Sequence, residues 1–85
     1  MKEQIIKSYA DYCRAEINRA EHALQVKMGG KPLFDKKEIY GNAIQRMIGA
    51  GDLAQMMASN ASIFEAIEAQ YNYYKNMLED LIESF

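Results

Sequence analysis

The sequence predicts an all-α protein, an antiparallel three-helix bundle in which residues 1–85 form a single domain. Apolar residues recur at alternating steps of three and four along three long stretches, the spacing that brings them to one face of a packed helix. The only proline and a glycine pair both fall between the first two stretches, and this places the main loop there. We expect helices over about residues 3–28, 36–59 and 63–84.

The first predicted helix, residues 3–28, carries a continuous apolar seam. Its members are Ile6, Ala10, Cys13, Ile17, Ala20 and Leu24. Because Cys13 is the only cysteine and lies on this seam, we expect a buried thiol rather than a reactive one. Glu16 lies at the edge of the stripe, where we expect its carboxylate to reach water. Gly29–Gly30 should end the helix in the left-handed conformation, and Pro32 prevents its resumption.

The middle helix, residues 36–59, has a clear start and the widest apolar surface. Asp35 and Glu38 have the spacing of a capping box. Phe34 and Ile39 have the spacing of a hydrophobic staple. The seam of this helix consists of Tyr40, Ala43, Met47, Ala50, Ala54 and Met57. Its apolar arc spans roughly 220°, about twice what a surface helix requires, so we expect neighbours on both flanks and a surplus for self-association.

Three glycines weaken this middle helix. Gly41, Gly49 and Gly51 each cost about 1 kcal/mol relative to alanine in a helix interior. Either they allow a close approach by a neighbour, or Gly49–Gly51 breaks the helix and Asp52 caps a new segment. We expect one helix with a bend. On the seam, Ala50→Leu should overpack the core by roughly 1–3 kcal/mol.

The third helix, residues 63–84, should begin at a capping box formed by Ser62 and Glu65. Its seam is bulky and comprises Phe64, Ile67, Tyr71, Tyr74, Leu78, Leu81 and Phe85. Because the other two seams are rich in alanine, we expect these large side chains to fill the groove between the first two helices. Tyr73 lies off the seam and is a candidate interface anchor. We interpret Glu65 and Glu68 as solvated carboxylates, since no E-x-x-H motif accompanies them.

The segment between the first two helices is the one candidate ligand site. It combines the free N–H groups of a helix start with glycines and lysines, namely Lys27, Gly29, Gly30, Lys31, Lys36 and Lys37. These features favour an anion such as a phosphorylated small molecule, a nucleotide or a nucleic-acid backbone. The alternative interpretation is purely structural: the glycines end the first helix, and the lysines lie in a turn that is exposed to solvent. Asp35 also competes with an anion for the helix-start donors, and the P-loop pattern is missing.

Charge and composition limit the remaining possibilities. Residues 1–48 carry nine positive and six negative side chains, whereas residues 49–85 carry one and six. This asymmetry suits either contacts between copies or complementary helices within one bundle. The N-terminus has no apolar signal-peptide region and no stretch is long enough to span a membrane, so we expect a cytoplasmic protein. The single cysteine fits a reducing compartment.

Catalysis is the least favoured function, because no serine or cysteine nucleophile is set beside a histidine, no metal-ligand cluster or cofactor motif is present, and His22 is the only histidine. The sequence predicts a helical interaction module without a cofactor that forms a homo-oligomer, a dimer or larger. We expect it to bind another macromolecule as a regulator, adaptor or inhibitor, of the kind that mobile elements encode. The candidate interface residues are Ile39, Ile44, Ile48, Leu53, Met57 and Tyr73. The alternative is a binding protein for a phosphorylated ligand or nucleic acid at the lysine-rich segment 27–37.

Overall fold

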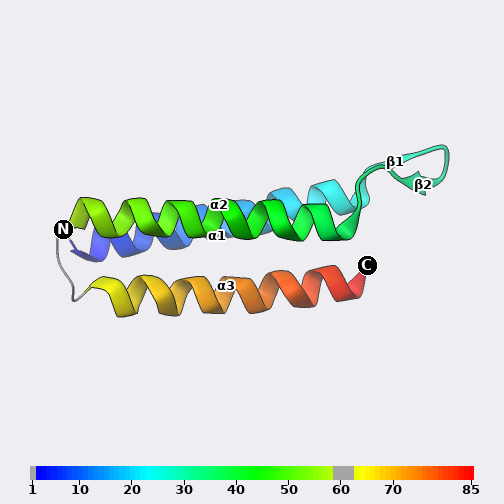
Figure 1. The fold of residues 1–85 in the computed structure, drawn as a ribbon. Helices are drawn as coiled ribbons and strands as arrows, with labels where there is room; N and C mark the ends of the chain where they lie inside the picture. Colours follow the sequence, from blue (N-terminus) through cyan, green and yellow to red (C-terminus); the bar gives the residue numbers. More distant parts are fainter. Residues whose placement is uncertain (1, 59–62) are drawn as a thin grey trace.

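The computed structural model describes residues 2–58 and 63–85 and contains three helices that lie side by side (Figure 1). α1 spans Lys2–Gln25, α2 spans Lys36–Ala58 and α3 spans Phe64–Ser84. The chain runs along the bundle, back and along again, and each helix contacts the other two. The bundle is elongated, with extents of 49 × 18 × 17 Å. The predicted all-α three-helix bundle is therefore confirmed.

A short antiparallel hairpin takes the place of the predicted end of the first helix. β1 (Lys27–Met28) pairs with β2 (Lys31–Pro32). Gly29 and Gly30 form the turn with φ of 62° and 82°, because a two-residue hairpin turn of matching twist requires positive φ at both central positions. The prediction that the helix continues to residue 28 was wrong. The left-handed glycine geometry is present, but it turns a hairpin rather than capping α1.

The core lies where the three predicted seams meet. From α3, Ile67, Tyr74 and Leu78 are buried against α1 and α2. The other two helices contribute small or medium side chains to the same core, including Cys13, Ala20, Ala43, Met47 and Ala54. The ends of the α3 seam differ from the prediction, since Phe64 and Phe85 are exposed and Ile63 is buried instead. The nesting of bulky α3 residues against a floor of smaller ones is present along the middle of the bundle.

α2 starts at a side-chain cap, as predicted. The Asp35 Oδ1 atom accepts a hydrogen bond from the backbone N–H of Lys37 at 3.3 Å, and its carbonyl accepts the first helical bond from Ile39 at 3.0 Å. The cap predicted at Ser62 lies outside the described residues. Ile63 directly precedes α3 and makes no side-chain cap bond.

α2 runs without interruption through Gly49–Gly51, so the expectation of one helix is confirmed and the alternative of a break is wrong. Gly51 is instead a point of close approach. A Cβ atom at this position would lie 3.2 Å from the Tyr9 hydroxyl oxygen and 3.3 Å from its Cζ atom. The Tyr9 hydroxyl donates a hydrogen bond of 2.9 Å to the Met47 carbonyl, one turn before Gly51. The missing side chain therefore allows the Tyr9 ring to lie directly against the backbone of α2.

This arrangement predicts opposite effects for two glycine-to-alanine changes in α2. Gly51→Ala should lower the free energy of unfolding by about 1–2 kcal/mol, because the added methyl group would push the Tyr9 ring away from the Met47 carbonyl to which its hydroxyl is hydrogen-bonded. Gly49→Ala should raise it by up to about 1 kcal/mol, since nothing lies within 4 Å of the added methyl group. Urea denaturation of both variants measures the difference. Equal stabilisation by both would show that Tyr9 does not pack closely on Gly51.

Candidate functional site

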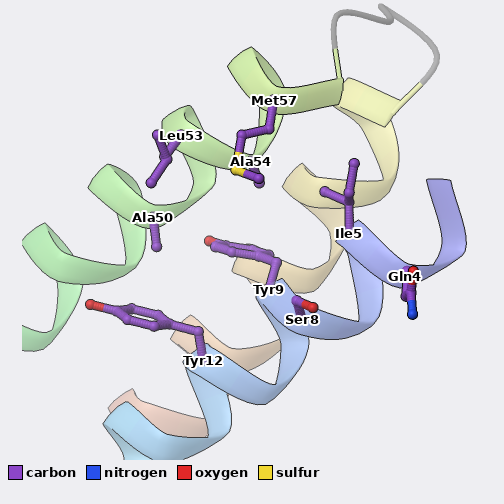
Figure 2. Close-up of a pocket in the computed structure, with 9 residues that line it drawn as sticks. All are labelled: Gln4, Ile5, Ser8, Tyr9, Tyr12, Ala50, Leu53, Ala54 and Met57. Atoms are coloured by element: carbon purple, nitrogen blue, oxygen red, sulfur yellow. The ribbon is translucent and has the colours of Figure 1, made fainter. Parts of the chain in front are cut away.

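An open groove lies between α1 and α2, near the N-terminus of α1. Its volume is about 420 Å³, and its lining comes from these two helices alone. The α1 side supplies Gln4, Ile5, Ser8, Tyr9 and Tyr12, and the α2 side supplies Ala50, Leu53, Ala54 and Met57. Figure 2 shows the rings of Tyr9 and Tyr12 extending from α1 towards α2. The groove therefore lies on a part of the α1–α2 pair that α3 leaves uncovered.

Small residues of α2 keep this groove open. Ala50 and Ala54 lie beneath it, while Leu53 and Met57 stand at its edge with 56% and 69% of their surface exposed. Ala50 is partly buried against the core, as its place on the predicted seam indicates, and it also lines the groove.

Among the described residues that line the groove, none carries a charge, and the polar groups come from Gln4, Ser8 and two tyrosine hydroxyls. Tyr9 forms part of its inner wall. Burial raises the pKa of the Tyr9 hydroxyl far above its ordinary value, so this group stays protonated and donates to the Met47 carbonyl. An uncharged, mainly apolar groove of this kind suits an apolar surface and disfavours an ion.

The predicted interface residues do not form one continuous patch. Only Leu53 and Met57 meet at the groove. Ile48 borders a smaller groove of about 230 Å³ between α2 and α3, next to Phe64. Tyr73 is exposed on α3, where its ring meets Tyr74 edge to face at a centroid distance of 5.0 Å. The exposed α2 residues of the predicted interface thus lie in two separate grooves, one beside α1 and one beside α3.

The other two predicted interface residues turn inwards. Ile39 is buried in the core of this chain, and Ile44 is partly buried against it. Neither side chain is freely available to a partner in this conformation. Both residues help to explain why the apolar arc of α2 is so wide, because two neighbouring helices use part of it.

Sequence reasoning missed the α1 side of the groove. Ile5, Tyr9 and Tyr12 are spaced by four and three residues, so they form a second apolar stripe beside the predicted seam. That spacing was the available signal. It was hidden because the stripe is only two turns long and lies directly beside the predicted seam.

Comparison of the chain with protein-family models, with curated proteins and with solved structures returns no match. The site is therefore interpreted from its geometry alone.

The residues of the predicted anion site are all exposed on or beside the hairpin. In the hairpin register, Lys27 lies opposite Pro32, and Met28 lies opposite Lys31. Since neighbouring residues of a strand point to opposite faces, the Lys27 and Lys31 side chains leave the hairpin on opposite sides. The side chain of Asp35 already accepts from the start of α2. The hairpin register therefore does not direct these two lysines towards one ligand.

Glu16 is the buried charged residue of the described structure, at 3% exposure, and the expectation that it reaches water was wrong. Its Oε1 atom accepts a 2.7 Å hydrogen bond from Nε of Arg46 on α2. Its Oε2 atom lies 3.9 Å from a guanidinium nitrogen of Arg19. Burial of a carboxylate requires such a partner. No local pattern indicates this pair, since 30 residues separate Glu16 from Arg46.

Polar contacts elsewhere hold the helices in register. Arg14 donates to the Tyr74 hydroxyl at 3.0 Å, and the Tyr40 hydroxyl donates to Glu79 at 3.0 Å. Burial, together with the bond to Glu79, raises the pKa of Tyr40. Cys13 is buried as predicted, and burial also raises the pKa of its thiol, which disfavours the reactive thiolate.

Two further searches cover the described residues only. Over residues 2–58 and 63–85, no helix is long and apolar enough to cross a membrane. Within the same ranges, no group of three or more histidine, cysteine, aspartate or glutamate side chains is placed to hold a metal ion.

Proposed function

We infer that the protein is a helical interaction module that binds a helix of another protein in the α1–α2 groove and also assembles with itself. The observation that carries the binding function is the uncharged groove with exposed Leu53 and Met57 at its edge. Large apolar side chains around a concave, uncharged surface are typical of protein-binding sites.

The packing of α3 indicates what this groove accepts. On one side of the α1–α2 pair, bulky α3 residues such as Tyr74 and Leu78 pack against smaller ones. At the groove, Ser8, Ala50 and Ala54 provide a similarly shallow surface that none of the three described helices covers. A partner helix would complete a four-helix arrangement by the same kind of packing.

The length of the groove sets the number of partner residues that contact it. On α1 it extends from Gln4 to Tyr12, which is about 12 Å at 1.5 Å per residue. Two turns of a partner helix match that length and present apolar side chains at positions i, i+3 or i+4, and i+7. The expected ligand is an amphipathic helix with aliphatic, methionine or aromatic side chains at these positions.

Selection from a displayed library of amphipathic helical peptides tests this function. Peptides selected on the wild-type protein should carry large apolar residues at the i, i+3 or i+4, i+7 spacing. Leu53→Lys should weaken their binding at least tenfold, about 1.4 kcal/mol, because it places a charge at the edge of an apolar groove. Ala50→Leu should weaken binding similarly with little loss of stability, because leucine would fill the groove.

Ile48→Lys is the matched control, since Ile48 is an exposed apolar residue of the same helix that borders a different groove. It should leave peptide affinity within about twofold of wild type, as is usual for a substitution outside a binding site. Selected peptides without the helical spacing, or equal losses for Leu53→Lys and Ile48→Lys, would contradict binding at the α1–α2 groove.

A further inference from the structure

The β1–β2 hairpin projects beyond the end of the bundle (Figure 1). Apolar side chains in and beside the hairpin are exposed. Val26, Met28, Leu33 and Phe34 are all exposed, and Met28 is the most open of them at 70%. A two-stranded hairpin is at best marginally stable in water without a surface to pack on. Its apolar side chains therefore indicate that a partner covers it.

The charge of the hairpin region identifies the kind of partner. Residues 26–37 contain four lysines and one aspartate, so their net charge is +3. Within the described residues, Lys27 and Lys31 form no ion pair. The hairpin thus presents unpaired positive charge next to apolar side chains, which fits an acidic surface with apolar residues.

The C-terminal end of α3 has the complementary character. Glu79, Asp80 and Glu83 give residues 76–85 a net charge of −3, and the last turn of α3 contains no basic residue. Acidic side chains near a helix C-terminus are unfavourable because they add to the negative end of the helix dipole, and a cation there is stabilising. Phe85, next to this acidic turn, is exposed. The end of α3 therefore offers a charge opposite to that of the hairpin and an apolar side chain that the hairpin can cover.

The shape of the molecule prevents the hairpin from folding back onto its own α3 without rearrangement. In Figure 1 the hairpin continues outwards on the α1–α2 side, and α3 ends short of it on the other side. Consider a two-fold axis at this end of the bundle, perpendicular to the plane that contains α3 and the hairpin. Rotation about it places the α1–α2 side of one copy opposite the α3 side of the other. The hairpin of each copy then lies along the end of α3 of the other, and both contacts form together, as in an isologous interface.

We propose that two copies of this chain associate at this end by exchanging hairpins, with the Met28–Lys31 face of each hairpin packed on the C-terminal end of the other copy's α3. Lys31 pairs with Asp80 or Glu83, and Met28 covers Phe85. Lys27 leaves the hairpin on the opposite face and stays outside the contact. This inference names the surface of self-association, and so it rests on the function proposed above.

Charge reversal at two lysines of the same hairpin tests the exchange. Sedimentation equilibrium of the full chain should show a dimer whose dissociation constant rises at least tenfold in Lys31→Glu. Lys27→Glu makes the same change in net charge on the other face and should alter it less than threefold. Circular dichroism should show the same helix content and melting for both variants, because both lysines are exposed.

Reversal of the partner charges provides the decisive arm. Asp80→Lys with Glu83→Lys should weaken the dimer when introduced alone and restore it in combination with Lys31→Glu. A dimer that Lys31→Glu leaves unchanged, or that the combined variant does not restore, would overturn the hairpin exchange but leave self-association itself standing. A monomer at all concentrations up to about 1 mM, a range in which weak association is detectable, would overturn both.

Discussion

Replacing Leu78 by alanine should lower the free energy of unfolding by about 3 kcal/mol or more. Leu78 is completely buried between α1 and α2, so the change removes buried methyl groups and leaves a cavity that the helices close only in part. In a domain of this size each kcal/mol corresponds to about 4–8 °C, so the melting temperature should fall by about 12 °C or more. Thermal unfolding followed by circular dichroism measures the effect.

Phe85→Ala is the control for this experiment. Phe85 continues the same predicted seam but is exposed at the end of the chain. Measured at low protein concentration, at which the proposed dimer would be dissociated, this variant should lose less than about 0.5 kcal/mol. Similar losses at Leu78 and Phe85 would mean that the α3 seam is buried to its end, contrary to the structure.

Replacing Arg46 by methionine should cost about 3 kcal/mol, the second large effect. The change leaves the Glu16 carboxylate buried with only Arg19, 3.9 Å away, as a nearby charge. Removal of one partner of a buried pair typically costs 3–5 kcal/mol. We expect the lower end of that range, because the Arg46 side chain is 39% exposed and water can enter in its place.

The double variant Glu16→Met, Arg46→Met separates an unpaired charge from a loss of packing. It removes both charges and keeps long apolar side chains, so it should recover most of the stability lost in Arg46→Met. Urea denaturation of the wild type, the two single variants and the double variant gives the coupling energy. A coupling energy near zero would show that the pair behaves like a solvent-exposed ion pair.

Most of the fold followed from one-dimensional spacing. The seams of all three helices predicted Cys13, Met47 and Leu78 as core residues, and all three are buried. This succeeded because helix periodicity is a local property of the chain. The burial of Ile63 and the exposure of Phe64 were not predicted, since both depend on how the chain enters α3.

The hairpin shows where local signals competed. A glycine pair ends a helix or turns a hairpin, and both use positive φ. The flanking residues Val26 and Pro32 are poor helix formers, and this would have favoured the hairpin. The periodic pattern of the first helix extended to Leu24 and was carried forward too far.

The candidate site was only partly predictable from the sequence. The surplus apolar arc of α2 predicted Leu53 and Met57 as surface residues, and they do border the groove. The sequence could not show which of its apolar residues the other helices would cover, and for this reason Ile39 was placed at an interface although it is buried. The pairing of Glu16 with Arg46 also depends on the relative rotation of two helices, which spacing within one helix does not determine.

Tyr9 belongs to the core and to the groove at the same time. One part of its ring packs on Gly51 and its hydroxyl is bonded to the Met47 carbonyl, while another part forms a wall of the groove. A molecule lying in the groove would therefore rest on the side chain that sets the spacing between α1 and α2. Binding of such a molecule would change the distance between α1 and α2. The ultraviolet signal of the six tyrosines can report this change, because the chain has no tryptophan to obscure it.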